Sequence, residues 1–150
     1  MARRYVVPDA FTRRVVNPVV TGVSWLGISI AGSRVLEVRG RRSGLPRRTP
    51  VNVLSVDGGR FLVAPRGETQ WVRNLRAAGE GYLLLGGIRL RFAAVEVPEE
   101  EREPVLRAYL RRWTWEVGKF FGGVTADSPA GELRRIAPDH PVFRIQVPAP

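Results

Sequence analysis

Two short glycine-containing turns, each lying between apolar segments, restrict what this chain can fold into more than any other feature. Asp57-Gly58-Gly59 separates residues 51–56 from residues 61–64, and Gly86-Gly87 separates residues 82–85 from residues 88–97. Because glycine adopts the positive φ angles that tight hairpins require, we expect each pair of segments to form an antiparallel hairpin. Strands joined by such short turns argue against a doubly wound parallel sheet. The sequence therefore predicts a mainly antiparallel β-fold, closed into a small barrel.

Helices are expected at the periphery of this barrel, together with two further strands. The strands are predicted at residues 35–39 and 141–147, and the helices at 69–78, at 128–136 and after Pro98. Thr69 is a suitable N-cap for the first helix, and Gly79 is suited to end it. The helix after Pro98 has an apolar face that is typical of core packing; it contains Val105, Leu106, Tyr109, Leu110 and Trp113.

The chain is expected to divide into a helical N-terminal segment, residues 1–29, and a barrel domain, residues 30–150. Arginines beside apolar residues would let the first segment contact an anionic membrane at its inner face, although packing over the barrel or against a second subunit is favoured. No apolar run reaches the roughly 18 residues of a membrane span, so we expect a cytoplasmic protein that contacts a membrane at most peripherally. A homodimer is a further expectation.

The lack of cysteine narrows the chemistry. The 150 residues include no cysteine and one histidine, His140. This excludes zinc–thiolate sites, iron–sulfur clusters, cysteine nucleophiles and multi-histidine metal sites. His140 lies between Asp139 and Pro141 where a strand begins, which favours a structural role. Any reaction must therefore use a bound cofactor or carboxylate, hydroxyl and guanidinium groups, and no metal site is predicted.

An arginine cluster lies between two of the predicted strands. The net charge is +10, and the clustered arginines are Arg39, Arg41, Arg42, Arg47 and Arg48. Glycines at 40 and 44 let backbone N–H groups turn toward an anion, and the arginines and Ser43 add donors. Residues 40–50 are therefore predicted to form a turn that binds phosphate or carboxylate, with a solvated basic hairpin as the alternative. Nucleic acid is not an expected partner, since aromatic residues are not interleaved with the cluster.

A second arginine–glycine pair, Arg66-Gly67, follows the strand that ends at Ala64. The helix start near Thr69 would direct its free N–H groups toward the same end of the barrel. Two such turns and a helix start favour an anion-binding site over a solvated hairpin.

Several motifs occur together in this sequence. They are Gly40-Arg41-Arg42-Ser43-Gly44, Pro46-Arg47 and Pro50, then Leu62-Val63-Ala64, Trp71 and Asn74-Leu75, and later Glu101-Arg102, Ala137-Pro138 and His140-Pro141-Val142-Phe143. Over residues 30–147 the chain thereby resembles the deazaflavin-dependent nitroreductase family.

The resemblance implies a split β-barrel of the FMN-binding type. It also implies coenzyme F420, a deazaflavin with a phospholactyl group and a polyglutamate tail, with FMN as the alternative cofactor. The cofactor-binding residues that it implies are Arg41, Arg42, Ser43, Gly44, Arg47, Pro50, Val51, Ala64, Pro65, Arg66, Gly67, Trp71, Asn74 and Leu75. Reduced F420 would give a hydride from its C5 carbon to an acceptor, and no catalytic protein residue is assigned.

The acceptor is less well defined, because the chain departs from the family pattern where nitro-reducing members carry tyrosines. It has Asn52-Val53 and Phe120-Phe121 in those regions. We expect Asn52, Trp115, Phe120 and Phe121 to line a pocket for a hydrophobic acceptor such as a quinone or enone, with nitroaromatics less favoured. A non-catalytic protein that binds a flavin, haem or fatty acid on the same barrel is the alternative function.

Overall fold

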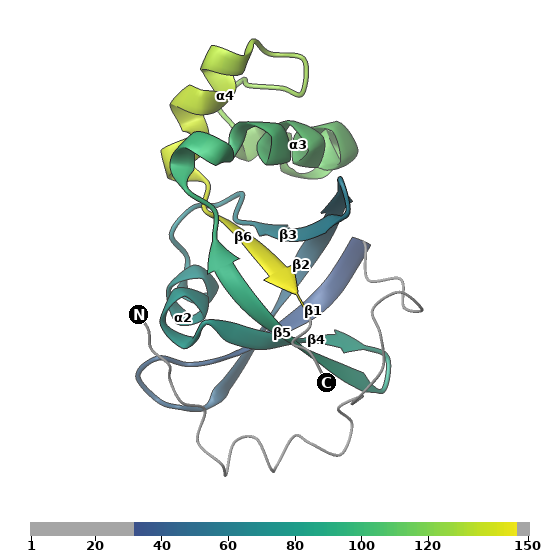
Figure 1. Cartoon of the computed structure of the whole chain (residues 1–150), viewed down its shortest axis with the longest axis vertical. Helices are drawn as coiled ribbons and strands as arrows, with labels where there is room; N and C mark the ends of the chain where they lie inside the picture. Colours follow the sequence, from purple (N-terminus) through teal and green to yellow (C-terminus); the bar gives the residue numbers. More distant parts are fainter. Residues whose placement is uncertain (1–31, 147–150) are drawn as a thin grey trace.

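The computed structural model describes residues 32–146, which form a closed barrel of antiparallel strands with helices packed against it (Figure 1). The strands are β1 (Gly32–Arg39), β2 (Pro46–Val56), β3 (Gly59–Val63), β4 (Glu80–Leu85), β5 (Ile88–Glu96) and β6 (Val142–Gln146). Their order around the barrel is β1-β2-β3-β6-β5-β4. The predicted barrel with peripheral helices is confirmed. The predicted helical segment at 1–29 lies outside the described residues.

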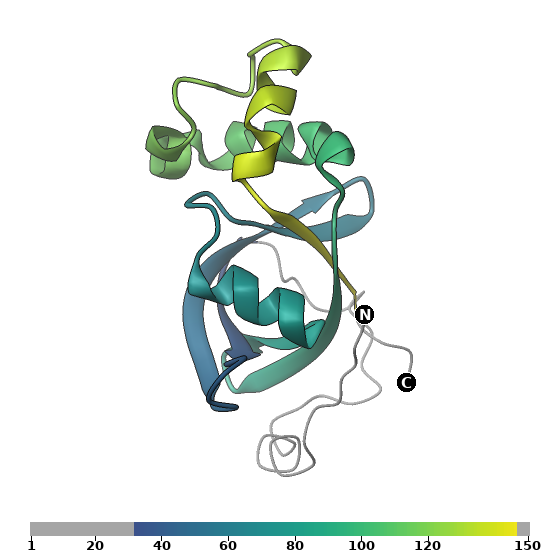
Figure 2. The same ribbon diagram turned by 90° about the vertical axis from the view of Figure 1, so that its left-hand side faces the viewer.

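The helices lie in two places around the barrel (Figure 2). They are α2 (Gln70–Ala78), α3 (Glu103–Val117) and α4 (Ala130–Ile136), with short 3₁₀ turns η2 (Glu99–Glu101), η3 (Gly118–Phe120) and η4 (Ala137–Asp139). Helix α2 packs on the side of the barrel, whereas α3 and α4 form a layer over one end. None of the helices in the described part of the chain is long and apolar enough to cross a bilayer.

Both predicted hairpins are present. Val56 pairs with Gly59 across a turn in which Asp57 and Gly58 have φ angles of 50° and 76°. Leu85 pairs with Ile88 across the second turn. Positive φ at Asp57, Gly58 and Gly86 matches the right-handed twist of the flanking strands, which explains why these short turns set the strand register.

Alternate residues of β2 and β3 enter two different cores. Val53 and Leu62 lie in the barrel interior. Their neighbours Leu54 and Phe61 lie in a second cluster with residues of α3 and α4. These strands are therefore apolar on both faces, because the helical layer covers the outer face. That layer is held in position partly by the buried Arg102, which donates 2.8 Å hydrogen bonds to the carbonyl oxygens of Val97 and Ala137.

The arginine-rich turn is shorter than predicted, and this difference creates an opening in the barrel wall. Strand β2 begins at Pro46, so residues 40–45 form the turn and Arg47 lies in a strand. Residues 46–52 pair with β1, whereas pairing with β3 starts only at Val53. This free edge accommodates Pro50, which has no N–H to donate to a second strand. Prolines at 46 and 50 therefore mark a free strand edge, although in the sequence they suggest a longer turn.

Candidate functional site

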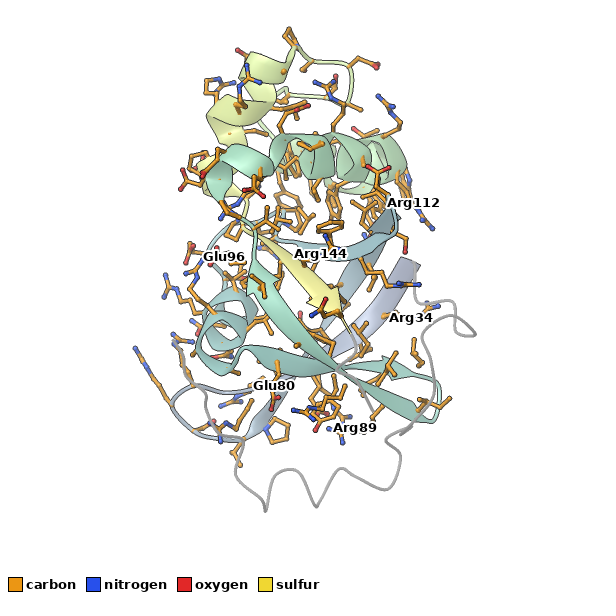
Figure 3. All side chains as sticks on the ribbon, in the orientation of Figure 1. Arg34, Glu80, Arg89, Glu96, Arg112 and Arg144 are labelled. Atoms are coloured by element: carbon orange, nitrogen blue, oxygen red, sulfur yellow. The ribbon has the colours of Figure 1, made fainter. Side chains whose placement is uncertain are left out.

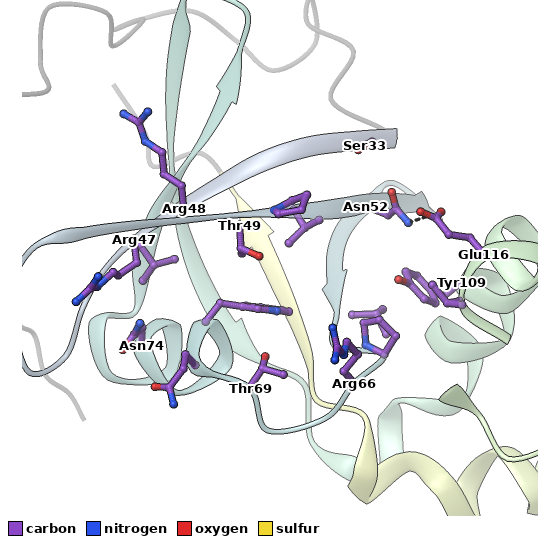
Figure 4. Close-up of a pocket in the computed structure, with 18 residues that line it drawn as sticks. Ser33, Arg47, Arg48, Thr49, Asn52, Arg66, Thr69, Asn74, Tyr109 and Glu116 are labelled. Atoms are coloured by element: carbon purple, nitrogen blue, oxygen red, sulfur yellow. Dashed lines mark hydrogen bonds between the residues drawn. The ribbon is translucent and has the colours of Figure 1, made fainter. Parts of the chain in front are cut away.

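The free edge of β2 borders a cavity of about 800 Å³ (Figure 4). The first half of β2 forms one wall. The loop after β3 and the first turn of α2 form the opposite wall, and α3 closes one end. The predicted site residues that line the cavity are Arg47, Pro50, Val51, Asn52, Pro65, Arg66, Trp71 and Asn74. Residues from both predicted arginine loops therefore face one space.

The other predicted cofactor residues lie around this cavity without lining it. Arg41, Arg42, Ser43 and Gly44 form the neighbouring turn. Ala64 and Leu75 are buried in the barrel core. Gly67 has a φ of 84°, and a Cβ there would lie 3.3 Å from the carbonyl oxygen of Asp139. These residues shape the walls, whereas the residues that line the cavity are available to a ligand.

Asn74 fixes the arginine-rich turn to α2. Its Oδ1 atom accepts hydrogen bonds from the Arg41 backbone N–H at 3.0 Å and from the Arg41 guanidinium at 2.8 Å. The same guanidinium donates to Gln70 at 2.9 Å. Asn74 is only 5% exposed, so this contact is well protected from water. The Arg41 guanidinium is thus held by neutral amides, and its role in the free protein is to position the turn.

The residues predicted for the acceptor are not brought together. Asn52 lines the main cavity, but Trp115 is 80% exposed and lies outside it. Phe120 and Phe121 border a second recess of about 480 Å³, together with His140. Helix α3 is kinked at Trp113, where φ is −126° and ψ is 22°. Trp115 lies beyond this kink on the exposed side of α3, whereas Trp113 and Val117 are buried at helical spacing from Tyr109.

The lining residues that sequence reasoning did not assign to the site include Thr69, Tyr109 and Glu116. Thr69 occupies the predicted N-cap position of α2, but its side chain makes no capping hydrogen bond. Its Oγ1 atom is buried and has no hydrogen-bond partner among the described residues. A buried hydroxyl without a partner costs free energy, so this atom is a favourable place for a ligand to bind. The sequence feature that could have indicated Thr69 as a site residue is its position at a predicted helix start, close to the arginine–glycine pair at 66–67.

Charge is distributed unevenly along the cavity. Arg47 and Arg66 form no ion pair with any carboxylate in the described part of the chain, whereas Arg48 is paired with Glu37 at 2.9 Å. The N-terminus of α2 adds partial positive charge on the same wall as Arg66. Glu116 is the carboxylate among the lining residues, and it lies near Tyr109 at the end closed by α3 (Figure 4). The end of the cavity at Arg47 therefore suits an anionic group, Arg66 adds a second cation along the opposite wall, and the end at Tyr109 suits a neutral polar group.

Tyr109 closes that second end. Its side chain is 2% exposed, and burial raises the pKa of its hydroxyl to about 12. A hydrogen bond from Asn52 acts in the opposite direction, and the charge of Glu116 raises the pKa further. Asn52 also donates to Glu116 at 3.2 Å. Since burial dominates, Tyr109 remains a protonated hydroxyl at neutral pH.

His140 lies outside the main cavity and has a structural environment. Its ring stacks on Phe121 with the centroids 4.1 Å apart, and Nδ1 lies 3.3 Å from the carbonyl oxygen of Ala64, to which it donates. Burial lowers the pKa of His140 below its ordinary value of 6.5, although the contact with Ala64 raises it slightly. The neutral imidazole is therefore the form that the fold favours.

Acidification is expected to destabilise the protein through His140. Because the folded state has the lower pKa, it binds fewer protons than the unfolded state as the pH falls below 6.5. The contribution is fully present above 6.5 and is lost progressively as the pH falls toward the folded-state pKa. Urea unfolding between neutral pH and about pH 5 measures this loss. His140→Gln removes the one histidine and should flatten the profile in this range; an unchanged slope would contradict the assignment.

Comparisons with known proteins identify the family of the chain and support its fold. Residues 10–116 match the sequence profile of the family described as F420H(2)-dependent quinone reductase. No curated protein sequence matches the chain.

Solved structures share the fold at low sequence identity. Atu2129, a protein of unknown function from Agrobacterium tumefaciens, has a TM-score of 0.54 and 19% identity over 79% of this chain and 49% of its own. This chain thus spans about half of that protein. A structure described as a domain-swapped dimer has a TM-score of 0.52 and 19% identity over 91% of this chain and 95% of its own. The F420-H2 dependent reductase FDR-A has a TM-score of 0.50 and 20% identity over 76% of this chain and 93% of its own.

The structural matches support the split β-barrel, and the sequence match extends over more than half of the chain. This protein therefore belongs to the F420H(2)-dependent quinone reductase family.

Proposed function

We propose that the cavity beside β2 holds coenzyme F420 and that the protein uses it to reduce a quinone. Membership of the family makes the protein an F420-dependent reductase, with F420 as its cofactor. The binding residues and the acceptor are our proposal. The observation that carries it is a cavity with Arg47 at one end, the Tyr109 hydroxyl at the other, and Arg66 on the wall between them.

The chain's own residues fit an anionic, flat cofactor. Arg47 and Arg66 offer guanidinium groups that no described carboxylate neutralises, and they would bind the phosphate and the carboxylates of the tail. The buried Thr69 hydroxyl lacks a partner and would gain one from a polar atom of the ligand. Pro50, Val51 and the half-buried Trp71 provide apolar surface for a ring system.

The protein's contribution to the reaction is mainly positional. When bound, the reduced deazaflavin supplies a hydride from C5. The β2 edge and the loop at Pro65 and Arg66 border the space in which both molecules must meet. Holding them in contact and away from water provides the proximity that hydride transfer needs.

A neutral, apolar acceptor fits the remaining space best. Val63, Pro65 and Val117 contribute apolar lining, and the Glu116 carboxylate would repel an anionic acceptor. A quinone combines an apolar ring with neutral carbonyl oxygens, and an enone shares this chemistry. Of the acceptor classes expected from the sequence, we therefore favour quinones over nitroaromatics.

The test is a titration of the full chain with oxidised F420 and with FMN, followed by oxidation of reduced F420 with menadione or a nitroaromatic compound. We expect F420 to bind at least about tenfold more tightly than FMN, and menadione to be the faster acceptor. Tighter binding of FMN would overturn the cofactor assignment. Binding of F420 without turnover of any acceptor would favour the non-catalytic alternative.

Two expectations about assembly remain proposals. A homodimer is supported by the similar fold of the domain-swapped dimer, and light scattering of the purified chain would measure it. Peripheral membrane contact was predicted for residues 1–29, which lie outside the described residues. Co-sedimentation with anionic vesicles would test that contact.

A further inference from the structure

The cavity end closed by α3 contains polar groups for which the cofactor-binding residues give no explanation. Tyr109 comes from α3, and Asn52 comes from the free edge of β2. Figure 4 shows the Tyr109 oxygen directed toward the cavity and the Asn52 amide linked to Glu116. The cationic residue Arg47 lies at the opposite end of the same view. The Tyr109 hydroxyl is therefore directed toward the part of a bound ligand that lies farthest from Arg47.

Packing explains the ring of Tyr109 but not its hydroxyl. The ring contacts Trp113 at a centroid distance of 5.1 Å and Phe121 at 6.3 Å, within the core shared by α3 and the barrel. A phenylalanine would make the same contacts without placing a polar atom at the cavity. The ring packing instead fixes the direction of the hydroxyl, which is a requirement for an oriented hydrogen-bond donor.

Asn52 leaves the hydrogen of this hydroxyl free. Its Nδ2 atom donates to Glu116 Oε1 at 3.2 Å, which identifies the nitrogen end of the amide. Within residues 32–146 the Tyr109 hydroxyl donates to no protein acceptor, although it borders the cavity. The hydroxyl hydrogen therefore remains available for an acceptor oxygen of a bound ligand.

We propose that the Tyr109 hydroxyl donates a hydrogen bond to a carbonyl oxygen of the acceptor, with Asn52 and Glu116 orienting it. The inference rests on the proposed quinone reductase function and assigns a catalytic residue for it. The acceptor would therefore be a molecule with an apolar body and a carbonyl oxygen. It would be neutral, because the Glu116 carboxylate disfavours an anion.

The reaction balances without a proton from Tyr109. The C–H bond at C5 of the reduced cofactor would break, and its hydrogen and electron pair would form a new bond on the quinone, giving a hydroquinone monoanion. The ring N–H proton that the oxidised cofactor then releases would reach this monoanion through water, so that the products are the neutral oxidised cofactor and the hydroquinone. As negative charge develops on the carbonyl oxygen, the hydrogen bond from Tyr109 strengthens, and this lowers the barrier. Burial keeps Tyr109 protonated throughout, so the donor is present at any pH near neutrality.

The test compares Tyr109→Phe with wild type and with Tyr82→Phe, a matched control. Tyr82 is equally buried but stacks on Arg89 and does not line the cavity. With menadione as acceptor, we expect Tyr109→Phe to lower kcat by at least about tenfold with little change in KM, because the hydrogen bond is strongest in the transition state. The Kd for oxidised F420 and the thermal midpoint should match those of wild type, and Tyr82→Phe should keep wild-type kcat.

A second variant, Asn52→Asp, tests the same hydrogen bond without changing Tyr109 itself. In Asn52→Asp the new carboxylate would accept the Tyr109 hydrogen and withdraw it from the acceptor, so kcat should fall although the ring of Tyr109 is unchanged. Wild-type rates in both variants would overturn the role of Tyr109 while leaving the proposed function intact. F420 binding without menadione reduction by wild type would instead remove the proposed function, and the inference with it. A loss of F420 affinity in Tyr109→Phe would assign the hydroxyl to the cofactor and also overturn the inference.

Discussion

Replacing Glu37 with alanine is expected to lower the free energy of unfolding by about 3–5 kcal/mol. Glu37 lies on β1 and is 0% exposed. Its carboxylate accepts a hydrogen bond from Arg48 at 2.9 Å and another from Arg89, whose side chain is 7% exposed. The alanine variant removes the buried carboxylate that Arg48 and Arg89 both contact. Removing one partner of a buried ion pair costs far more than the net stabilisation that the intact pair provides.

Urea unfolding at neutral pH would measure this effect, with Glu80→Ala as the matched control. Glu80 and Arg89 both lie toward the barrel end away from α3 and α4 (Figure 3). The partner of Glu80 is Arg91, at 2.8 Å, and the Arg91 side chain is 50% exposed. We expect the control to cost about 1 kcal/mol or less, as for other solvent-exposed ion pairs. Equal losses in the two variants would show that burial does not distinguish these ion pairs.

The ion pair between Glu37 and Arg48 also affects the charge that the cavity offers to a ligand. Arg48 lines the cavity but is already paired with Glu37, which it shares with Arg89, whereas the adjacent Arg47 forms no ion pair with a described carboxylate. Two neighbouring arginines in the same strand therefore differ in what they can offer an anion. Their strand alternation places them on opposite faces, and only one of those faces meets the buried carboxylate.

Much of the barrel could be predicted from local sequence. The turns at Asp57-Gly58 and Gly86-Gly87 identified β2–β3 and β4–β5, because hairpin pairing depends on residues close together in the chain. The pairing of β3 with β6 joins Leu62 to Phe143, which no local pattern indicates. Barrel closure through such distant pairs is what leaves residues 46–52 with a free edge, and so the cavity wall could not be located from the sequence.

Some site residues could be predicted from the sequence and others could not, because again only local patterns are visible in it. Arg66 and Trp71 were recognised because they belong to continuous motifs beside a helix start. Tyr109 has the helical spacing of a core residue, and it is one; its hydroxyl reaches the cavity because α3 crosses the end of the barrel. Trp115 lies between the buried Trp113 and Val117 of α3, so helical spacing directs it to the exposed face. Periodicity predicts which face of a helix is buried but not what lies opposite each buried atom.

Charge reversal at the cavity arginines is expected to have the largest effect on cofactor binding. A hydrogen bond to a charged group contributes about 1.5–3 kcal/mol, so Arg47→Glu and Arg66→Glu should each raise the Kd for oxidised F420 by at least about tenfold. The double variant should raise it by about 100-fold or more, provided that the two sites act independently. Titration at low and high salt would measure both the loss and its electrostatic origin, since added salt should weaken wild-type binding more than that of the double variant.

Two control variants distinguish the effect of the cavity arginines on F420 binding from the effect of the overall charge. Arg134→Glu makes the same charge change on an exposed residue of α4 and should leave the Kd within about twofold, because surface charges beyond a Debye length are screened. Arg42→Glu tests the turn that the sequence emphasised. Arg42 is exposed and does not line the cavity, so we expect a loss well below that of Arg47→Glu. If Arg42→Glu were the most damaging variant, the cofactor's anionic groups would lie along the turn and outside the cavity. Arg47 on the adjacent strand edge and Arg66 on the opposite wall would then lose their assigned role in binding.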